Sequence, residues 1–420
     1  MNYNRARRQK TAGVIRYSCG ILFALFSFVY IYFLQGDVMA VAQHVFSHGI
    51  THYSFLCGAI IVTGVLLVLQ WIVAVVTKLP PRWYALSFVP SFLLLAIVTD
   101  FNRHNIHQFT FGHWLWIAPL VLILFVACVL LVKSAEKSVF SRFMRELPAL
   151  LWPNYLVLFA CIVLLGLTHS ADDVFMYELK TERLILQHRY DEASRVGLKS
   201  LEISPRLANL RMHALSMTGQ LGECLFDYPQ PFGENGLINL TDTDQTYERF
   251  TTRQLCLSLG AVPAHSVSTT ARYLQLLQRW QQQWADSLAL IRQTDSVYLA
   301  TNDSLRQRHE WKEALIRRQM RRTADYVLCA QLLRHDLQAF VATLPLHYHL
   351  SDSDETVKAS LPRAYREALA QAAPLLADTA TLAQRRRYVQ MRDTLADPLV
   401  RHNLTRRQFG KTFWWHYDNQ

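Results

Sequence analysis

Residues 113–132 read HWLWIAPLVLILFVACVLLV, twenty positions without an acidic residue, a lysine or an arginine. The hydrocarbon core of a bilayer is about 30 Å thick, and a helix needs roughly 20 apolar residues to cross it. Lipid offers backbone N–H and C=O groups no partner, so a run of this length must bond to itself as a helix. The segment therefore predicts a transmembrane helix.

Four further apolar runs, separated by short loops that carry charge or proline, meet the same demand: residues 17–34, 55–76, 83–98 and 149–167. After residue 168 the chain becomes charged, and its apolar residues recur at helical spacing. We therefore expect an all-α protein with a five-helix transmembrane bundle over residues 1–168 and a helical domain over residues 169–420. The first span is long and aromatic and lacks a small-residue cleavage site, so we expect an uncleaved anchor.

The basic residues predict the orientation of the chain. The net charge of +11 divides into +8 for residues 1–168 and +3 for residues 169–420. Lys and Arg precede the first span and fill the second–third and fourth–fifth loops, whereas the other two loops carry only Arg103. Because basic loops stay in the cytoplasm, the N-terminus should lie inside and the tail outside, in the periplasm of a bacterial inner membrane. Loop charge explains the high pI, so we expect no nucleic-acid partner.

The seven cysteines divide between the two regions. Four lie inside predicted spans, where small apolar side chains pack helices together. Cys224, Cys256 and Cys329 lie in the tail, where an oxidising compartment permits one disulfide and leaves one thiol over. The spacing does not say which two would pair.

The tail resembles a helical-hairpin repeat. Tyr190, Ala193 and Pro205 are similar to the second half of a tetratricopeptide repeat. That resemblance implies that a small residue lets two helices approach, that an aromatic ring fills the gap, and that proline ends the second helix. The pattern returns from Gly219 through Leu221 to Cys224, and more faintly over residues 335–340. The first two copies are 31 residues apart, which is shorter than the family period of 34.

The last forty residues combine basic and aromatic side chains, with Phe413, Trp414 and Trp415 close to Arg406 and Lys411. Such a mixture can stack single-stranded nucleic acid, cap the last repeat, or lie at the lipid interface. The predicted location favours capping or membrane contact.

The first outer loop reads as a short helix over residues 36–49. At 100° per residue, Asp37, His44 and His48 would project on one side. His104 and His107 lie in the other outer loop. Imidazole binds zinc, copper and haem iron, so a divalent metal or haem site of a redox component is one hypothesis. The alternative, which we favour, is that Asp37 caps the helix, that His48 lies at its C-terminus, and that no cofactor binds.

An acidic residue just outside the first span also resembles the lipid-linked-sugar glycosyltransferases. That resemblance rests on Asp37 alone and implies a catalytic carboxylate there. Such enzymes generally have more than five spans, and no second catalytic motif accompanies Asp37.

Over nearly its whole length the chain resembles uncharacterised bacterial inner-membrane proteins that join a small helical bundle to a tetratricopeptide-like tail. The resemblance rests on the loop from Gln43 to Tyr53, the hairpins at residues 190–205 and 336–345, and the ending Trp414-Trp415. It implies an architecture and no activity. We therefore expect an interaction scaffold, without enzymatic activity, whose partners are the bilayer and other envelope proteins or peptides, with the glycosyltransferase and metal-binding hypotheses as alternatives.

Overall fold

The computed structural model describes residues 2–101, 112–136, 147–168, 172–238, 248–259, 270–293 and 303–419. Throughout these ranges the chain forms helices joined by turns and contains no β-strand, which confirms the all-α prediction. The chain divides into two compact units, one formed by Met1–Met176 with Thr246–Arg249 and the other by Tyr177–Gln245 with Phe250–Gln420.

The described part of the first unit contains eight helical segments and the start of α7. They are α1 (Asn2–Val29), the π-helix η1 (Tyr30–Leu34), α2 (Gly36–Phe46), α3 (Phe55–Thr77), the 3-10 helix η2 (Pro81–Phe88), α4 (Val89–Thr99), α5 (Trp114–Glu136) and α6 (Leu147–Thr168). Five stretches are long and apolar enough to cross a membrane: Ala12–Leu34, Phe55–Thr77, Pro81–Thr99, Trp114–Ser134 and Leu150–Leu167. The five predicted apolar helices are therefore present.

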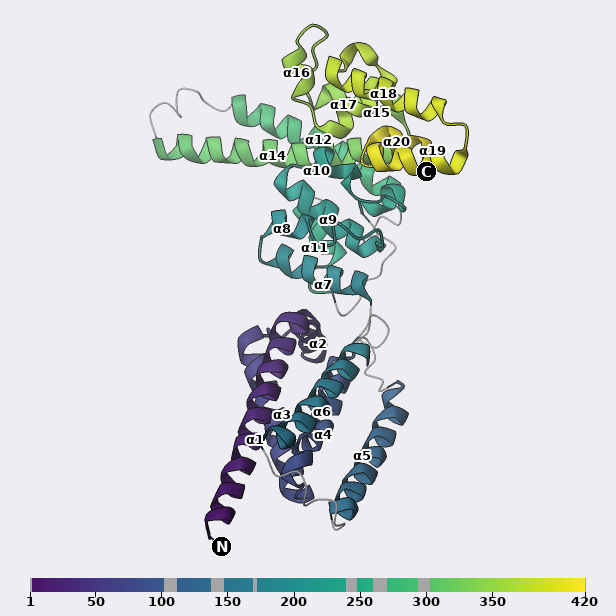
Figure 1. Ribbon diagram of the computed structural model, residues 1–420. Helices are drawn as coiled ribbons and strands as arrows, with labels where there is room; N and C mark the ends of the chain where they lie inside the picture. Colours follow the sequence, from purple (N-terminus) through teal and green to yellow (C-terminus); the bar gives the residue numbers. More distant parts are fainter. Residues whose placement is uncertain are drawn as a thin grey trace. The chain divides into compact units, whose positions relative to one another are not determined.

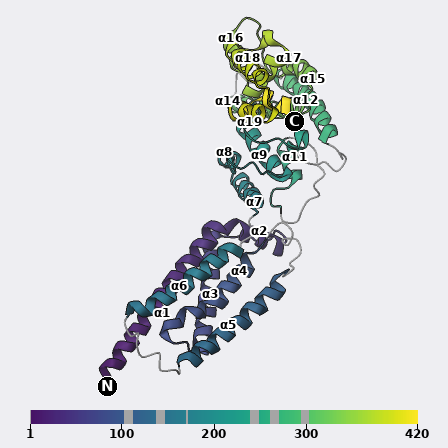
Figure 2. The ribbon, with the colours of Figure 1, turned by 45° about the vertical axis from the view of Figure 1, so that its right-hand side comes forward.

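Four of the spans pack around one core, and α5 stands at the edge (Figures 1 and 2). Phe23 of α1 contacts the rings of Phe88 and Phe92 at 4.9 and 5.0 Å between centroids. By contrast, only 6% of the α5 span is buried within the protein. Lipid-facing apolar side chains are expected on spans, because lipid is their solvent.

The third span is not a continuous α-helix. It begins as a 3-10 helix after Pro80, and Pro90 stands in the first turn of α4. Proline has no backbone N–H to donate within an α-helix. Backbone carbonyl and amide groups near it therefore lack their usual helical hydrogen-bond partners. Asn154 of α6 supplies the partners: its Oδ1 accepts the N–H of Ala85 at 2.7 Å, and its Nδ2 donates to the carbonyl of Pro81 at 2.9 Å. One buried amide thus stabilises the irregular turn inside the bundle.

Gln70 of α3 also hydrogen-bonds to this segment. Its amide donates to the hydroxyl groups of Ser87 and Tyr84, both at 2.9 Å. Ser91 donates to the carbonyl of Leu66 at 2.9 Å. These polar side chains therefore form hydrogen bonds between helices of the bundle.

The second unit begins in α7, and its remaining helices run to the end of the chain. They are α7 (Asp173–Leu186), α8 (Tyr190–Ser194), α9 (Pro205–Thr218), α10 (Leu221–Cys224), η4 (Leu225–Asp227), η5 (Gly233–Gly236), α11 (Thr252–Ser258), α12 (Thr270–Gln293), α14 (Asp303–Leu333), α15 (Leu337–Thr343), η7 (Leu344–Leu346), α16 (Glu355–Ala359), α17 (Arg363–Ala372), η8 (Pro374–Leu376), α18 (Thr379–Thr394), α19 (Pro398–Phe409) and α20 (Phe413–Asn419).

The long helix α14 contacts several other helices of this unit. Its C-terminal half is buried, with Tyr326 and Cys329 fully inaccessible, and it packs against α9, α10, α15 and η5. Its N-terminal half pairs with α12, and the two extend together from the body of the unit (Figure 1). Leu277 and Leu288 of α12 are buried there.

Candidate functional site

Three helices of the second unit end in the same way. His188, Gly219 and His335 each adopt a left-handed backbone, with φ of 59°, 73° and 61°. At each end the next residue donates its N–H to the carbonyl five residues earlier: Arg189 to Leu184 at 2.9 Å, Gln220 to Leu215 at 2.8 Å, and Asp336 to Gln331 at 2.9 Å. This is the Schellman arrangement, which satisfies the last carbonyls of a helix. The three helix ends are therefore geometrically equivalent.

A short helix starts two residues after each of these ends. Its first residue is Tyr190 in α8, Leu221 in α10 and Leu337 in α15. The chain thus forms three hairpins with one junction geometry, α7–α8, α9–α10 and α14–α15, and α11 and α12 lie between the second and third in sequence.

In the first hairpin the small residue is buried and the aromatic residue is half-buried. Ala193 is fully buried, in a cluster with residues of α7 and α9 that includes Ile185 and Ala214. Tyr190 is half-buried, with its ring centroid 6.1 Å from that of His213 in α9. Its hydroxyl lies 2.9 Å from Nδ1 of His188, and burial raises its pKa. Tyr190 therefore joins the junction to the next hairpin.

The second hairpin uses its small residues in a related way. Leu221 is fully buried. A Cβ added to Gly222 would lie 2.8 Å from the ring of Tyr365 in α17. Glycine there permits the close approach of α10 and α17.

The expected role of Pro205 is wrong. It was expected to end the second helix of the first hairpin, but α8 ends at Ser194 and Pro205 is the first residue of α9. The missing N–H costs nothing at that position, and the fixed φ suits a helix start. Ser204 caps the same end by accepting the N–H of Leu207 at 3.0 Å.

A polar groove of about 530 Å³ lies along the first two junctions. We call it the junction groove; it is lined by His188, Arg189, Tyr190, Asp191, Glu192, Met217, Thr218 and Gln220. Arg189 pairs with Glu192 on the rim, with Nε 2.8 Å from Oε1. The exposed side chains of Asp191 and Gln220 make no hydrogen bond to another described residue.

The chemistry of the junction groove suits binding better than catalysis. The Thr218 hydroxyl already donates to helix carbonyls, and the Tyr190 hydroxyl is held by His188. A carboxylate and an amide that are free of internal bonds can instead hydrogen-bond an extended peptide backbone.

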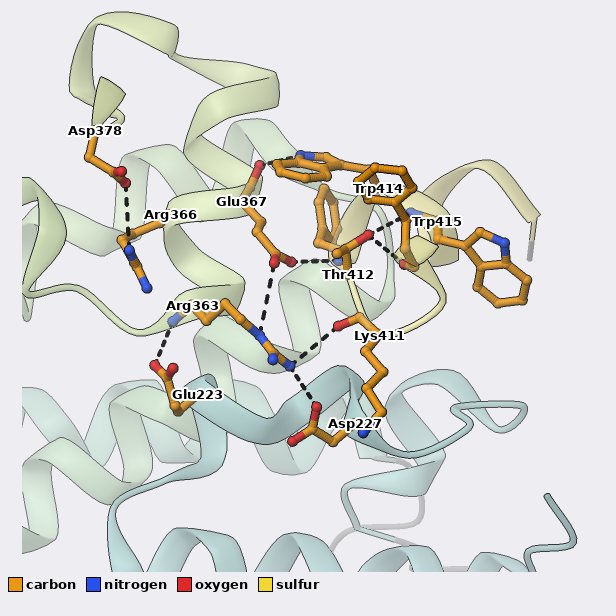
Figure 3. A network of polar contacts seen from close by, with 12 residues as sticks. Glu223, Asp227, Arg363, Arg366, Glu367, Asp378, Lys411, Thr412, Trp414 and Trp415 are labelled. Atoms are coloured by element: carbon orange, nitrogen blue, oxygen red, sulfur yellow. Dashed lines mark hydrogen bonds and ion pairs between the residues drawn. The ribbon is translucent and has the colours of Figure 1, made fainter. Parts of the chain in front are cut away.

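A second polar network joins the second hairpin to the C-terminal helices, with Arg363 of α17 at its centre (Figure 3). The Arg363 backbone N–H donates to Glu223 at 2.8 Å. Its guanidinium donates to the carboxylate of Asp227 at 2.8 Å and to the carbonyl of Lys411 at 3.3 Å. One residue therefore connects α10, η4 and the turn that precedes α20.

Glu367, one turn further along α17, hydrogen-bonds to the first residues of the last helix, α20. Its carboxylate accepts the N–H of Phe413 at 2.7 Å, and its backbone carbonyl accepts the indole N–H of Trp414 at 2.8 Å. Burial raises the pKa of Glu367 to about 7, although the Phe413 N–H and the Arg363 cation act against the shift. Phe413 and Trp414 are each 1% exposed, so they belong to the core. The expected roles at the lipid interface and in capping a last repeat stay predictions.

The three tail cysteines are free thiols. Cys256 and Cys329 are buried, and Cys224 is half-buried. Burial raises the pKa of all three, that of Cys224 to about 11. A protonated, buried thiol is a poor nucleophile.

The short helix after the first span differs from its predicted geometry. The helix α2 has Gln35 as its N-cap and Asp37 as its second residue, so the predicted cap at Asp37 is wrong. It ends at Phe46, and His48 lies beyond it with φ of 51°. The alignment of Asp37, His44 and His48 required a helix through residue 48 and is therefore also wrong. Within the described ranges no group of three His, Cys, Asp or Glu side chains is placed to hold a metal ion; His104 and His107 lie outside those ranges.

Sequence reasoning missed a carboxylate at the same end of the bundle. Asp100 follows α4, and its side chain is only 6% exposed. Its Oδ2 accepts the indole N–H of Trp114 at 2.6 Å and lies 3.3 Å from Nε2 of His113. These contacts tie the end of α4 to the start of α5. The available signal was an ionisable residue directly after an apolar run.

Searches of curated proteins and of solved structures found no match. A family model matches residues 103–264 and 267–420, which include the last two spans and almost all of the second unit. The chain belongs to a family of unknown function, DUF6057.

Proposed function

We propose that the protein is a membrane-anchored interaction scaffold that presents a tetratricopeptide-like domain on the outer side of a bacterial inner membrane. The observation that carries the proposal is the threefold recurrence of one helical-hairpin junction, at His188, Gly219 and His335. Repeated hairpins stack through their nearest neighbours and leave an elongated surface for binding. The proposal is of a tetratricopeptide-like domain and not of a regular repeat, because α8 and α10 contain only five and four residues.

We propose that the partner binds in the junction groove. The groove combines two charged groups of opposite sign on its rim with an unbonded carboxylate and amide. Such a surface suits an extended peptide segment of another envelope protein. Anchoring in the membrane would raise the local concentration of scaffold and partner. The proposal requires no cofactor and no nucleic acid.

The proposed topology has the N-terminus in the cytoplasm and residues 169–420 as the domain in the periplasm. Five apolar helices support it, since an odd number of crossings places the two ends of the chain on opposite sides. A cysteine at Asp418, in a background without reactive thiols, tests it with a membrane-impermeant maleimide. Labelling in cells with a permeabilised outer membrane and an intact inner membrane supports a periplasmic tail, and labelling only after lysis contradicts it.

A comparison of two pairs of variants tests the function. Ala193→Leu overpacks the first hairpin, and Tyr190→Ala removes the aromatic side of the junction groove. Asp37→Asn and His44→Ala change the outer-loop helix instead. Affinity capture from native membranes should lose its partner with the first pair and keep it with the second. The reverse result would favour the glycosyltransferase or metal-binding hypothesis.

A further inference from the structure

The loop over residues 195–204, between α8 and α9, lies beside the beginning of α7. At one end the Ser204 hydroxyl donates to the carboxylate of Glu178. Near the other end Gly197 has φ of 64°, and a Cβ there would lie 2.9 Å from the ring of Tyr177. Arg211 fixes the turn by donating to the carbonyl of Val196 at 2.6 Å. The loop therefore has a defined place on the second unit.

This loop exposes apolar and basic side chains together. Leu198 is 44% exposed and Leu201 is 67% exposed. Arg195, Lys199 and Glu202 are exposed within the same ten residues, which leaves one net positive charge on the loop. Leucine next to lysine or arginine is favoured at a bilayer surface, where the apolar part enters the boundary region and the cation meets lipid phosphate.

The covalent chain limits the distance from this loop to the membrane. The span α6 ends at Thr168, and α7 begins at Asp173. Even a fully extended chain covers at most about 18 Å over five residues. Tyr177 follows four residues later, which adds about 6 Å along a helix. Nine residues of chain therefore separate Tyr177, which contacts the loop, from the end of α6.

We propose that the loop over residues 195–204 is a bilayer contact, with Leu198 and Leu201 in the headgroup region and Arg195 and Lys199 at anionic lipid phosphates. The proposal is independent of the scaffold function, because it requires only that α6 spans a membrane. It would keep the first hairpin close to the lipid. A partner of the junction groove would then be a protein that can reach the membrane surface.

Depth-dependent quenching tests this contact in the full chain. The parent carries Cys57→Ser, which removes the exposed native thiol, and serves as the control for background labelling. Leu198→Cys and Leu201→Cys receive an environment-sensitive fluorophore in nanodiscs that contain phosphatidylcholine and phosphatidylglycerol. Leu375→Cys is the matched control, since Leu375 is 85% exposed and lies between α17 and α18.

We expect a lipid with a nitroxide on its acyl chain near the headgroup to quench the labels at 198 and 201 several times more than the label at 375. Aqueous iodide should show the opposite order, and Lys199→Glu should reduce the lipid quenching. Equal iodide quenching at all three positions would overturn the proposal. Shielding from iodide without quenching by the lipid nitroxide would assign the surface to a protein and would also overturn it.

Discussion

Replacing Gly219 by alanine isolates the energetic cost of a left-handed hairpin junction. The residue has φ of 73°, and no atom lies within 4 Å of an added Cβ, so the substitution introduces no steric clash. An L-residue in this conformation costs about 1–2 kcal/mol. Reduced freedom of the unfolded chain returns about 0.4–1 kcal/mol. The second unit should therefore lose about 1 kcal/mol of unfolding free energy, which lowers its melting temperature by roughly 2–4 °C.

At the equivalent position His335, we expect the reverse substitution to have the opposite effect on the unfolding free energy. His335 has φ of 61°, so His335→Gly relieves the same conformational cost and should raise the unfolding free energy, although the ring contact with Tyr417 at 4.7 Å is lost. Gly236→Ala is the control, because its Cβ would meet only ordinary contacts beyond 3.5 Å. Urea unfolding in nanodiscs, followed by tryptophan fluorescence, measures all three. A neutral Gly219→Ala, or a loss of stability equal in Gly236→Ala, would refute the equivalence of the junctions.

Three further predictions concern buried polar groups. Burial raises the pKa of Glu367 in the folded protein to about 7 from 4.5. Its contribution to the unfolding free energy is therefore complete below pH 4.5 and is lost as pH rises through 7. Urea titrations at several pH values should show that Glu367→Gln removes about 3 kcal/mol of this change in unfolding free energy with pH. Burial lowers the pKa of His213 to about 4 from 6.5, so stability should fall as pH decreases from 6.5 towards 4, and a His213→Phe variant should show a weaker loss. In the bundle, Asn154→Leu leaves the N–H of Ala85 without its partner, and thermal aggregation in detergent should begin at a lower temperature, consistent with a cost of about 1–3 kcal/mol. An unchanged midpoint in any of these would contradict the assigned role.

The sequence predicted the membrane helices because hydropathy is a property of each segment alone. It did not predict that the third span starts as a 3-10 helix, although Pro81 and Pro90 are visible in it. Backbone groups near the proline lack helical hydrogen-bond partners. Whether this irregular helix is stable depends on a hydrogen-bond partner such as Asn154, which lies on another span. The packing of one span against another is not visible in the local sequence.

The hairpin junctions were partly readable. Gly219 marks a left-handed helix end by its residue type, whereas histidine at positions 188 and 335 gives no such signal. The role of Pro205 was misjudged because proline both follows helix ends and begins helices, and local sequence does not separate the two cases.

The network around Arg363 could not be derived from spacing. Arg363 and Asp227 are 136 residues apart, and the pKa of Glu367 depends on the burial that α20 provides. A carboxylate in a charged helix is ordinarily solvated, so nothing local distinguishes Glu367 from its neighbours. Asp100 had a weak local signal, but its contact with Trp114 required the packing of α4 against α5.

Photo-crosslinking in living cells would test the scaffold account most directly. A photoreactive residue at Gln220, in the junction groove, is compared with one at Gln390, an exposed position on α18. The account predicts a discrete adduct with an envelope protein at Gln220 and none at Gln390. The Gln220 adduct should disappear in Ala193→Leu and persist in Asp37→Asn. No adduct at Gln220, or an adduct that depends on Asp37 and is indifferent to Ala193, would contradict it.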